Sequence, residues 1–433
     1  MREIGHFIGG KTVLGKSGRY GDVFNPNTGE VQAKVALGSA SEVREAVATA
    51  KAAQPQWAAK NPQARARVML KFLEIIANEK EELARMLSME HGKTIPDSLG
   101  DIQRGVEVAE FACGIPHLMK GEFTEGAGPG IDMYSLRQPV GVAAGITPFN
   151  FPAMIPLWKA APAIACGNAF ILKPSERDPS VPMRIAEIFI EAGLPPGILN
   201  VVNGDKEAVD AILDDPDIGA IGFVGSTPIA EYVYTRGTAH GKRVQSFGGA
   251  KNHMIILPDA DLNQAVDALI GAGYGSAGER CMAISVAVPV GEKTADALME
   301  KLVPRVEKLK VGLSTDREAD YGPLVTRQHL EKVKGYIDVG IKEGATLAVD
   351  GRGFRMQGYE NGYFLGGSLF DHVKPEMRIY KEEIFGPVLS VVRAQSYSEG
   401  LDLASQHEYG NGVAIYTRDG DAARDFASKV QVG

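Results

Sequence analysis

From residue 140 onward, short apolar runs alternate with amphipathic stretches, and this alternation constrains the fold more than any other feature of the sequence. The runs VGVAAGI, NAFILKP, GILNVVNG and AIGFVGS are separated by segments with helical spacing of apolar residues, such as SVPMRIAEIFIEAG. Strands and helices that take turns at this spacing form βαβ units, which build a parallel, doubly wound sheet. We therefore predict an α/β fold whose ligands bind beyond the carboxyl ends of the strands.

A second alternating series begins near residue 252 with the run HMIILPD. It continues with a helix from about 261, the run ISVAVPV, a helix over 293–310, the run FGPVLSVVRA, a helix near 397–406, the strand VAIYT and a final helix. A chain of 433 residues with 44% hydrophobic composition exceeds the size at which one core stops growing, so two compact units are expected. We place their boundary near 250, in the Gly-rich segment FGGAKN.

Before residue 140 the sequence predicts helices and one irregular segment. Ser39-Ala-Ser-Glu42 is a capping-box pattern ahead of apolar residues at helical spacing, so a helix begins near residue 41. Two further helical stretches cover about 63–92 and 97–113. The segment 121–138 is rich in Gly and polar residues, which predicts either a loop or an extended arm.

Charge and hydropathy exclude several classes of partner. The 46 basic and 54 acidic side chains give a net charge of −8 without any block of like charges, so nucleic acid is not an expected partner. The N-terminus has too few apolar residues for a secretory signal, and no apolar stretch is long enough to span a membrane. We predict a soluble, cytoplasmic protein; a mature mitochondrial protein without its presequence would have the same composition.

The three cysteines are too few for a disulfide framework and lack the CxxC spacing of a metal site, so no metal is predicted. Cys281 lies in GERCM, where an adjacent cation and nearby backbone N–H groups would lower the thiol pKa and make it nucleophilic. An ordinary core cysteine is the alternative. Cys166 lies among small apolar residues and Cys113 at a helix end, and both are interpreted as core residues.

Two segments are candidates for cofactor binding. Ser226 lies in GSTPIA, which follows a strand and opens a helix, so backbone N–H groups there would face an anion. A plain strand-to-helix turn is equally consistent with this pattern. Lys173 and Glu176 in KPSE could bind the two hydroxyls of a ribose, and the carboxylate favours NAD over NADP, although Arg177 weakens that preference. A solvated surface cluster is the alternative.

Asn150 lies in the rigid segment TPFNFP, between two prolines and two aromatic residues. An amide held in this way is well placed to donate a hydrogen bond to a developing oxyanion. A turn asparagine that caps the following helix is the alternative interpretation.

Together, PFNFP, KPSE, FVGST, a Gly-Gly-x-Lys stretch, GERC and EEIFGPV resemble the aldehyde dehydrogenase family in order and spacing, along nearly the whole chain. The resemblance implies an NAD-binding Rossmann-type domain over 1–120 and 139–250, an oligomerisation arm over 121–138 and a catalytic domain over 251–433. A homodimer or homotetramer is the implied assembly. Members usually continue for about fifty residues beyond SKVQVG, and that part normally supplies a strand which pairs with the arm of another subunit. Without it a sheet edge would stay unpaired, so we expect the sequence to be either shortened or incomplete.

The resemblance also implies roles for individual residues. Cys281 attacks the aldehyde, Asn150 and the backbone N–H of Cys281 hold the oxyanion, and a hydride leaves for NAD. The implied cofactor-binding residues are Lys173 and Glu176 at the adenosine ribose with Arg177 beside them, Ser226 at the pyrophosphate, Glu383 and Phe385 at the nicotinamide ribose and ring, and Thr147 and Phe149 along the cleft.

One departure from the family pattern concerns the acyl acceptor. Hydrolytic members carry a glutamate four residues before the lysine of the Gly-Gly stretch, where this chain has Phe247. A phenyl ring cannot deprotonate water, whereas a thiol with a pKa near 8.5 is partly ionised at neutral pH. Coenzyme A is therefore the expected acceptor, whether or not Phe247 is only a core residue.

FGGAKNH, the pair Arg280-Cys281 and Arg104 in DIQRGVEVAEFA are similar to the CoA-acylating methylmalonate-semialdehyde dehydrogenase subfamily. The substrates of that subfamily carry a carboxylate, which two guanidinium groups would hold by forked hydrogen bonds. Alternatively, Arg104 pairs with Glu107 or Asp101 on its own helix, and Arg280 pairs with some acidic neighbour. Two other functions remain open: a hydrolytic enzyme that uses another base, such as Glu279, and an inactive NAD-binding or structural protein.

Overall fold

The computed structural model describes residues 1–433, which divide into two compact units. Unit 1 comprises Met1–Phe24, Val31–Glu90 and Ser98–Gly248, and unit 2 comprises Asn25–Glu30, His91–Asp97 and Gly249–Gly433. The division at Gly248 lies next to the expected boundary, but residues 25–30 and 91–97 belong to unit 2 instead of the N-terminal domain. A hydrogen bond explains why residues 25–30 belong to unit 2, because the Asn27 amide donates to Ser314 Oγ over 2.9 Å.

The main sheet of unit 1 has seven strands. In spatial order they are β12 (Arg243–Phe247), β11 (Ile218–Val224), β8 (Val142–Ile146), β9 (Ala169–Lys173), β10 (Leu199–Val201), β2 (His6–Ile8) and β3 (Lys11–Val13). The first five run parallel, whereas β2 is antiparallel to both β10 and β3. Every residue of β9 is buried, as expected for the central strand of a sheet with helices on both faces.

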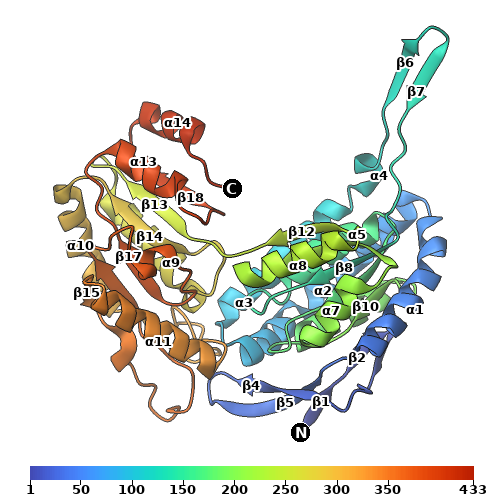
Figure 1. The fold of residues 1–433 in the computed structure, drawn as a ribbon. Coiled ribbons are helices and arrows are strands. Elements are labelled where there is room, and N and C mark those ends of the chain that lie inside the picture. Colours follow the sequence, from blue (N-terminus) through green and yellow to red (C-terminus); the bar gives the residue numbers. More distant parts are fainter. The chain divides into compact units, whose positions relative to one another are not determined.

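Helices cover this sheet (Figure 1), with α1 and α5 packed against β9 and α8 against β12. The helices between residues 40 and 239 are α1 (Ala40–Ala58), α2 (Pro62–His91), α3 (Ile95–Ala112), α4 (Ile115–Leu118), α5 (Met154–Ala165), α6 (Ser180–Glu191), α7 (Lys206–Asp214) and α8 (Thr227–Ala239), of which α4 lies at the base of the arm described below. A smaller sheet, absent from the sequence-based prediction, contains β1 (Arg2–Ile4), β5 (Glu30–Ala36) and β4 (Tyr20–Asn25). Its strands are short and lack strict alternation, so the pattern alone did not reveal them.

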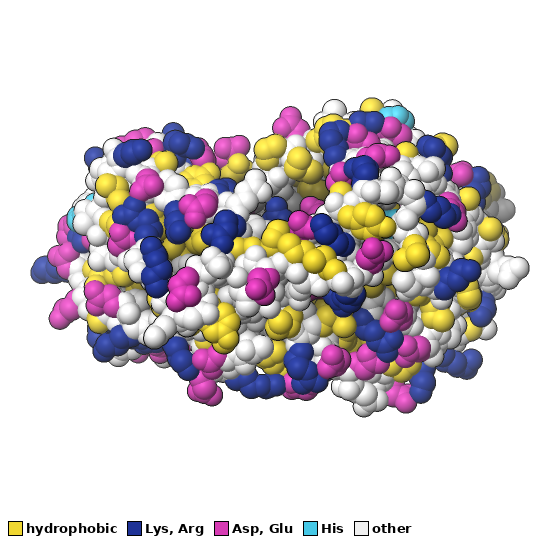
Figure 2. Space-filling model, turned by 90° about the horizontal axis from the view of Figure 1, so that it is seen from below, with side chains coloured by type: hydrophobic (Ala, Val, Ile, Leu, Met, Phe, Trp, Pro, Cys, Tyr) yellow, Lys and Arg dark blue, Asp and Glu magenta, His cyan; other side chains and the backbone are white.

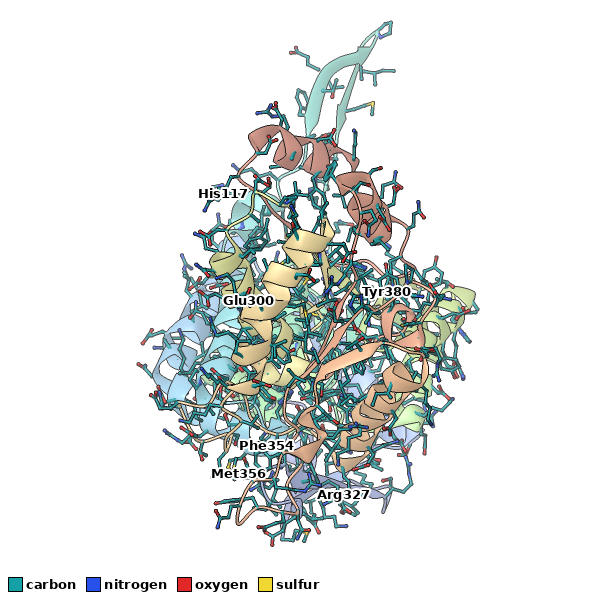
Figure 3. All side chains as sticks on the ribbon, turned by 90° about the vertical axis from the view of Figure 1, so that its left-hand side faces the viewer. His117, Glu300, Arg327, Phe354, Met356 and Tyr380 are labelled. Atoms are coloured by element: carbon teal, nitrogen blue, oxygen red, sulfur yellow. The ribbon has the colours of Figure 1, made fainter.

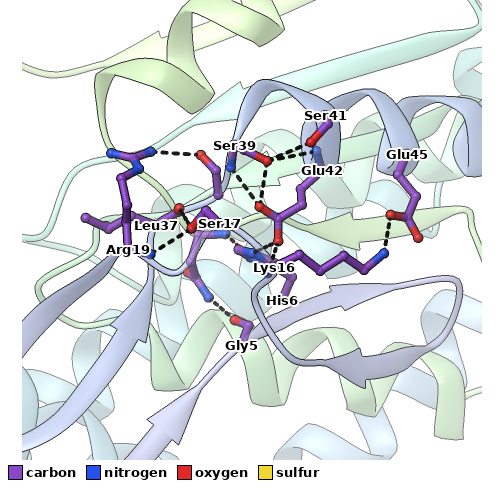
Figure 4. Close-up of polar contacts among 12 residues, drawn as sticks. Gly5, His6, Lys16, Ser17, Arg19, Leu37, Ser39, Ser41, Glu42 and Glu45 are labelled. Carbon is purple, nitrogen blue, oxygen red and sulfur yellow. Dashed lines mark hydrogen bonds and ion pairs between the residues drawn. The ribbon is translucent and has the colours of Figure 1, made fainter.

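The predicted capping box at the start of α1 is confirmed and belongs to a larger polar network (Figure 4). The Ser39 side chain accepts from the Glu42 N–H, and the Glu42 carboxylate accepts from the Ser39 N–H over 2.8 Å. The same carboxylate also accepts from the Lys16 N–H over 2.7 Å and lies 3.2 Å from His6 Nε2. This network fixes the N-terminal strands against α1.

Residues 121–138 form an extended arm, one of the two forms that the sequence predicted. They fold into the antiparallel hairpin of β6 (Phe123–Gly128) and β7 (Ile131–Tyr134), which projects from the rest of unit 1 (Figure 1). The hairpin and its flank carry large apolar side chains in an exposed state, namely Phe123, Ile131, Met133, Tyr134 and Leu136. An isolated hairpin with so much exposed apolar surface is typical of an interaction element.

Unit 2 is built on a second, mostly parallel sheet of six strands. In spatial order they are β15 (Thr346–Val349), β16 (Ser368–Asp371), β17 (Val388–Val391), β14 (Ile284–Pro289), β13 (Asn252–Ile256) and β18 (Val413–Tyr416). Its helices are α9 (Leu262–Tyr274), α10 (Glu292–Glu307), α11 (Arg327–Lys342), α12 (Arg378–Lys381), α13 (Tyr397–Ser405) and α14 (Gly420–Lys429). Only β15, at the edge, is antiparallel to its neighbour. The predicted fold class is confirmed, although β15, β16, α11 and α12 were not foreseen.

The charge distribution, the hydropathy of the helices and the grouping of metal-ligating side chains can be described directly. Basic and acidic side chains are interspersed on the face shown in Figure 2, without a continuous field of either sign. No helix combines the length and the apolar character that crossing a membrane requires. No group of three or more His, Cys, Asp or Glu side chains is arranged to hold a metal ion.

Candidate active site

Cys281 follows a strained turn between α9 and β14. We call residues 275–281 the nucleophile loop; it begins with the 3-10 turn η1 (Gly275–Gly278). Ser276 and Ala277 both adopt φ of 53°, a left-handed conformation that non-glycine residues rarely take. Gly278 adopts φ of 71°, and a Cβ atom there would lie 2.2 Å from the carbonyl oxygen of Gly386. The loop therefore requires glycine at 278 and holds two further residues under strain.

Two asparagines fix the backbone of Cys281, the candidate nucleophile. The side-chain amides of Asn252 and Asn411 donate to the Cys281 carbonyl oxygen over 2.8 and 2.9 Å. Burial raises the pKa of the Cys281 thiol, and the backbone N–H groups of Cys281 and Met282 act against this effect. The prediction of a lowered pKa is therefore wrong, because desolvation of the thiolate outweighs the donors around it.

Arg280 does not act as the neighbouring cation that the sequence suggested. Its guanidinium forms an ion pair with Asp97 and donates to the Gly271 carbonyl oxygen over 3.3 Å. The Asp97 carboxylate also accepts from the Ser276 N–H over 3.1 Å. Arg280 thus pairs with an acidic neighbour, as the alternative interpretation expected. Through Asp97 it is linked to the strained turn.

Residues 383–386, which we call the cofactor loop, lie beside the nucleophile loop in unit 2. Glu383, Phe385 and Cys281 line one recess together with Lys251 and Asn252. The Glu383 carboxylate accepts from the Ala250 N–H over 2.9 Å, and burial raises the pKa of this carboxyl. Phe385 adopts φ of 62°, so this loop is strained as well. The predicted grouping of Glu383 and Phe385 with the nucleophile is therefore present within this unit.

In unit 1, three predicted residues follow the carboxyl end of β8. The Thr147 N–H donates to the Lys173 carbonyl oxygen over 3.0 Å, which joins the ends of β8 and β9. The Thr147 hydroxyl is buried without a hydrogen-bond partner. Asn150 is buried, and the Phe149 ring lies under the Arg177 guanidinium at 5.1 Å. A buried orphan hydroxyl at the end of a parallel strand is an expected place for a ligand contact.

The KPSE segment forms a compact polar group at the end of β9. Lys173 Nζ lies 3.2 Å from Glu176 Oε2 and donates to the Gly204 carbonyl oxygen over 2.7 Å. Burial opposes ionisation of Glu176, but Lys173 and the backbone donors prevail, so the pKa of this carboxyl is lowered. Lys173 is buried and Glu176 is half-buried, which disagrees with a simple solvated surface cluster.

Ser226 is the N-cap residue of α8, but its side chain makes no capping hydrogen bond. Its exposed hydroxyl is thus available to an anion, whereas Pro228 has no N–H and the Ile229 N–H already donates to the Ser226 carbonyl oxygen over 3.1 Å. Unpaired hydroxyls at both Ser226 and Thr147, with the ionic pair of Lys173 and Glu176, fit the phosphates and ribose of a dinucleotide.

Arg104 lies on the exposed face of α3 and makes no ion pair. Its guanidinium contacts the Gly100 carbonyl oxygen at 3.2 Å. The two acidic neighbours have other partners, because Glu107 accepts from Gln103 and Asp101 accepts from the Met154 N–H. The helical ion pair considered from the sequence does not form, and this guanidinium can bind an anion from solution.

Phe247 ends β12 and is 51% exposed, so the interpretation as a core residue is wrong. The ammonium group of Lys159 lies 5.9 Å from the centroid of its ring. Burial lowers the pKa of Lys159 to about 8. Both side chains line an open cavity of about 590 Å³ in unit 1, on the side of the sheet formed by β8, β9, β11 and β12.

The other two cysteines have no features of a nucleophile. Cys166 caps the C-terminus of α5, and the Cys113 thiol contacts the Ala109 carbonyl oxygen at 3.4 Å. Both are half-buried instead of fully buried, and burial raises the pKa of each thiol. Sequence reasoning missed Asn252, Asn411, Lys251 and Asp97, because an isolated asparagine, lysine or aspartate carries no local pattern that marks a distant hydrogen-bond partner.

Comparison with known proteins adds a family and close relatives. A model of the Aldehyde dehydrogenase family matches residues 13–433. A malonate-semialdehyde dehydrogenase of Pseudomonas aeruginosa is 57% identical over 433 residues, covering 100% of this chain and 87% of that protein. The acylating, mitochondrial methylmalonate-semialdehyde dehydrogenase of Arabidopsis thaliana is 47% identical over 430 residues, covering 99% and 70%. A Sinorhizobium meliloti 1021 crystal structure, named as a methylmalonate-semialdehyde dehydrogenase complexed with NAD, gives a TM-score of 0.99 at 70% identity, covering 100% and 88% of the two chains.

Proposed function

The chain belongs to the aldehyde dehydrogenase family, and from this premise we propose that it oxidises malonate semialdehyde or methylmalonate semialdehyde with NAD and passes the acyl group to coenzyme A. The observation that carries the choice of acceptor is Phe247, which occupies the position of the water-activating glutamate. Without a general base at this position, a thioester on Cys281 persists until a better nucleophile than water arrives.

The second candidate base, Glu279, is not available to water. Its side chain is 0% exposed, and one carboxylate oxygen accepts from the Val325 N–H over 3.3 Å. A carboxylate enclosed in this way cannot reach a water molecule at an acyl group. This burial argues against a hydrolytic enzyme that would use Glu279.

In the proposed reaction, the Cys281 thiolate first attacks the aldehyde carbon, and the oxyanion that forms accepts hydrogen bonds from Asn150 and the Cys281 N–H. NAD, when bound, supplies the acceptor for the hydride of that carbon. The β-carboxyl thioester on Cys281 then loses CO2, and the resulting enolate takes up a proton from solvent. The coenzyme A thiolate displaces the Cys281 thiolate to give acetyl-CoA or propionyl-CoA. Release of NADH before this displacement makes the kinetics ping-pong.

The residues proposed to bind NAD are divided between unit 1 and unit 2. In unit 1, Lys173, Glu176 and Ser226 would hold the ribose and pyrophosphate, with Thr147, Phe149 and Arg177 beside them. In unit 2, Glu383 and Phe385 would hold the nicotinamide ribose and ring. Arg104 is the stronger candidate for the substrate carboxylate, because its guanidinium is unpaired, whereas Arg280 would share its charge with Asp97.

The hairpin of β6 and β7 supports a homodimer or homotetramer. Its apolar side chains are exposed over the whole element, as expected for a segment that another subunit covers.

The decisive experiment measures NADH formation from malonate semialdehyde at saturating NAD, with and without coenzyme A, and identifies the carbon product. We expect steady turnover only with coenzyme A, and acetyl-CoA as the product. A free acid formed at full rate without coenzyme A would contradict the proposal. Failure to oxidise any aldehyde, despite NAD binding, would favour the inactive or structural alternative.

A further inference from the structure

A buried polar cluster joins the two loops of unit 2, and its residues have no part in the chemistry above. Glu279 of the nucleophile loop is 0% exposed, and His329 in the first turn of α11 is 9% exposed. His329 Nε2 lies 2.6 Å from the Phe385 carbonyl oxygen and 3.5 Å from Glu279 Oε1. Because a carbonyl oxygen only accepts, Nε2 carries the hydrogen and donates to Phe385. One ring nitrogen therefore contacts both loops.

The Glu279 carboxylate has one further hydrogen bond and one further buried neighbour. Its Oε1 accepts from the Val325 N–H over 3.3 Å, and its Oε2 lies 3.9 Å from His91 Nε2. His91 Nδ1 accepts from the Lys93 N–H, so Nε2 of the neutral ring carries the hydrogen that faces Glu279. Burial lowers the pKa of His91 well below its ordinary value, which keeps this ring neutral. Glu279 thus forms a fixed anchor for His329.

The cofactor loop needs such an anchor because its backbone is strained. Phe385 adopts φ of 62°, and a non-glycine residue keeps this conformation only where its surroundings hold it. The short hydrogen bond from His329 acts on the carbonyl of this same residue. The Phe385 ring also packs edge-on against the His329 ring, with the centroids 6.3 Å apart.

The start of this loop has a separate support. The buried ammonium group of Lys251 donates to the carbonyl oxygens of Ile379 and Glu382 over 2.8 Å each. Lys251 touches neither Phe385 nor the nucleophile loop through these bonds. The side-chain link between the two loops therefore runs through His329 and Glu279.

We propose that His329 is a positioning residue, which ties the Phe385 carbonyl to the Glu279 anchor and so sets the cofactor loop in register with the nucleophile loop. This inference rests on the proposed function in one respect, namely that the cofactor loop contacts the nicotinamide end of NAD. Without the bridge, Phe385 relaxes toward ordinary backbone angles, its carbonyl loses its donor, and its ring leaves the position that NAD requires.

The test compares His329→Leu, which removes the donor, with His329→Gln, whose amide N–H can still reach the carbonyl. The matched control is His117→Leu, a change at an exposed histidine of α4 (Figure 3). We expect NAD to bind His329→Leu about tenfold more weakly, which corresponds to about 1.4 kcal/mol, in calorimetric titrations without substrate. The Gln variant should stay within about threefold of the parent, and the control should equal it.

A second readout follows the nucleophile loop directly. The rate of Cys281 alkylation by iodoacetamide, measured without NAD, should change in His329→Leu and Glu279→Gln but not in His329→Gln or the control. Equal NAD affinity and equal alkylation rates in the Leu and Gln variants would overturn the proposal. If circular dichroism shows that His329→Leu does not fold, His329→Asn replaces it, because the shorter amide side chain does not reach the Phe385 carbonyl oxygen. An Asn variant with the same NAD affinity and alkylation rate as the Gln variant would again overturn the proposal. A parent chain that binds no NAD would instead contradict the proposed function.

Discussion

The two units differ in how they hold their candidate residues at the ends of their sheets. In unit 1, Thr147, Lys173 and Ser226 occupy ordinary strand ends and a helix N-cap, with backbone angles open to any residue. In unit 2, the nucleophile and cofactor loops are strained. All five non-glycine residues with positive φ lie in this unit: Ser276, Ala277, His372, Phe385 and Asn411.

This difference teaches that cofactor binding and nucleophile placement make different demands on the chain. Ribose and phosphate groups are recognised by hydroxyls, a charged pair and helix N–H groups, which regular βαβ geometry supplies without strain. A thiol that must meet a carbon atom needs a defined direction, and unusual backbone angles provide it at a cost of about 1–3 kcal/mol per residue. Asp97, Asn252, Asn411 and His329 hold that geometry.

The largest expected effect comes from the nucleophile in the strained unit. Cys281→Ala should reduce aldehyde-dependent NADH formation by more than about 10³-fold, because no other side chain in the recess can form a thioester. Steady-state rates with malonate semialdehyde, NAD and coenzyme A check this. Cys166→Ala is the control and should retain activity. Near-normal oxidation by Cys281→Ala would mean that the nucleophile lies elsewhere.

Arg104→Ala tests a residue of the regular unit that the proposal makes specific for acidic aldehydes. We expect kcat/KM for malonate semialdehyde to fall about 10–100-fold, since a charge-assisted hydrogen-bond pair contributes about 1.5–3 kcal/mol. The value for propanal should not change. Arg67→Ala, at an exposed position of α2, is the control. An equal loss for both aldehydes would show that Arg104 has a structural role instead.

Phe247→Glu would introduce a candidate general base at position 247 of unit 1. NADH formation without coenzyme A should rise at least about tenfold, with a free acid as product, because a carboxylate can activate water at the Cys281 thioester. Phe247→Gln is the control, because the glutamine side chain has nearly the shape of glutamate but cannot act as a base. If both variants gain the same hydrolytic rate, the change would reflect water access, and Phe247 would act by excluding water.

The N-terminal network of unit 1 should make stability depend on pH. Burial would raise the pKa of Glu42, but the Ser39 and Lys16 donors overcome it, so the pKa lies below its unfolded value. A lowered pKa gives stability that is present above the unfolded value of about 4.3 and is lost as pH falls through the folded value. Burial also lowers the pKa of His6, so stability should already begin to fall below about pH 6.5.

Glu42→Gln isolates this contribution. The variant should lose about 1–3 kcal/mol of unfolding free energy at pH 7, because one oxygen that accepts hydrogen bonds becomes a donor. The difference from the parent should shrink as the pH falls through the lowered pKa of Glu42 in the folded parent. Urea titrations at several pH values, with Glu45→Gln as the exposed control, measure both effects. A difference that is independent of pH would contradict the assignment.

The smallest expected effect probes the strain itself. Ser276→Gly should raise unfolding free energy by up to about 1 kcal/mol in thermal unfolding, because glycine adopts φ of 53° without a steric penalty. The looser turn should at the same time reduce kcat several-fold. Ser226→Gly, in the regular unit, should give no such gain in stability. A Ser276→Gly variant with unchanged stability would show that the left-handed turn stores little strain.

Much of the fold was open to prediction because each central element carries its own periodic pattern. The strands around β8 and β9 and the helix after Ser39 follow from local apolar spacing and capping chemistry. Within residues 311–380, β15 and β16 have only four residues each and depend on their neighbours. Helix α11, in contrast, has 16 residues, a Thr326 N-cap and buried apolar residues at helical spacing, so its local pattern was open to prediction and was missed. The segments 25–30 and 91–97 joined unit 2 because contacts distant in sequence decided where they pack.

The sequence by itself determined the family, the candidate nucleophile Cys281 and the presence of a phenyl ring at Phe247, because these depend on which chemical groups stand in a motif. Only the tertiary structure decided how those groups are paired. It assigned Arg280 to Asp97, left Arg104 unpaired, enclosed Glu279 and raised the pKa of Cys281. Charge pairing and desolvation depend on distances between residues far apart in the chain, and no local pattern encodes those distances.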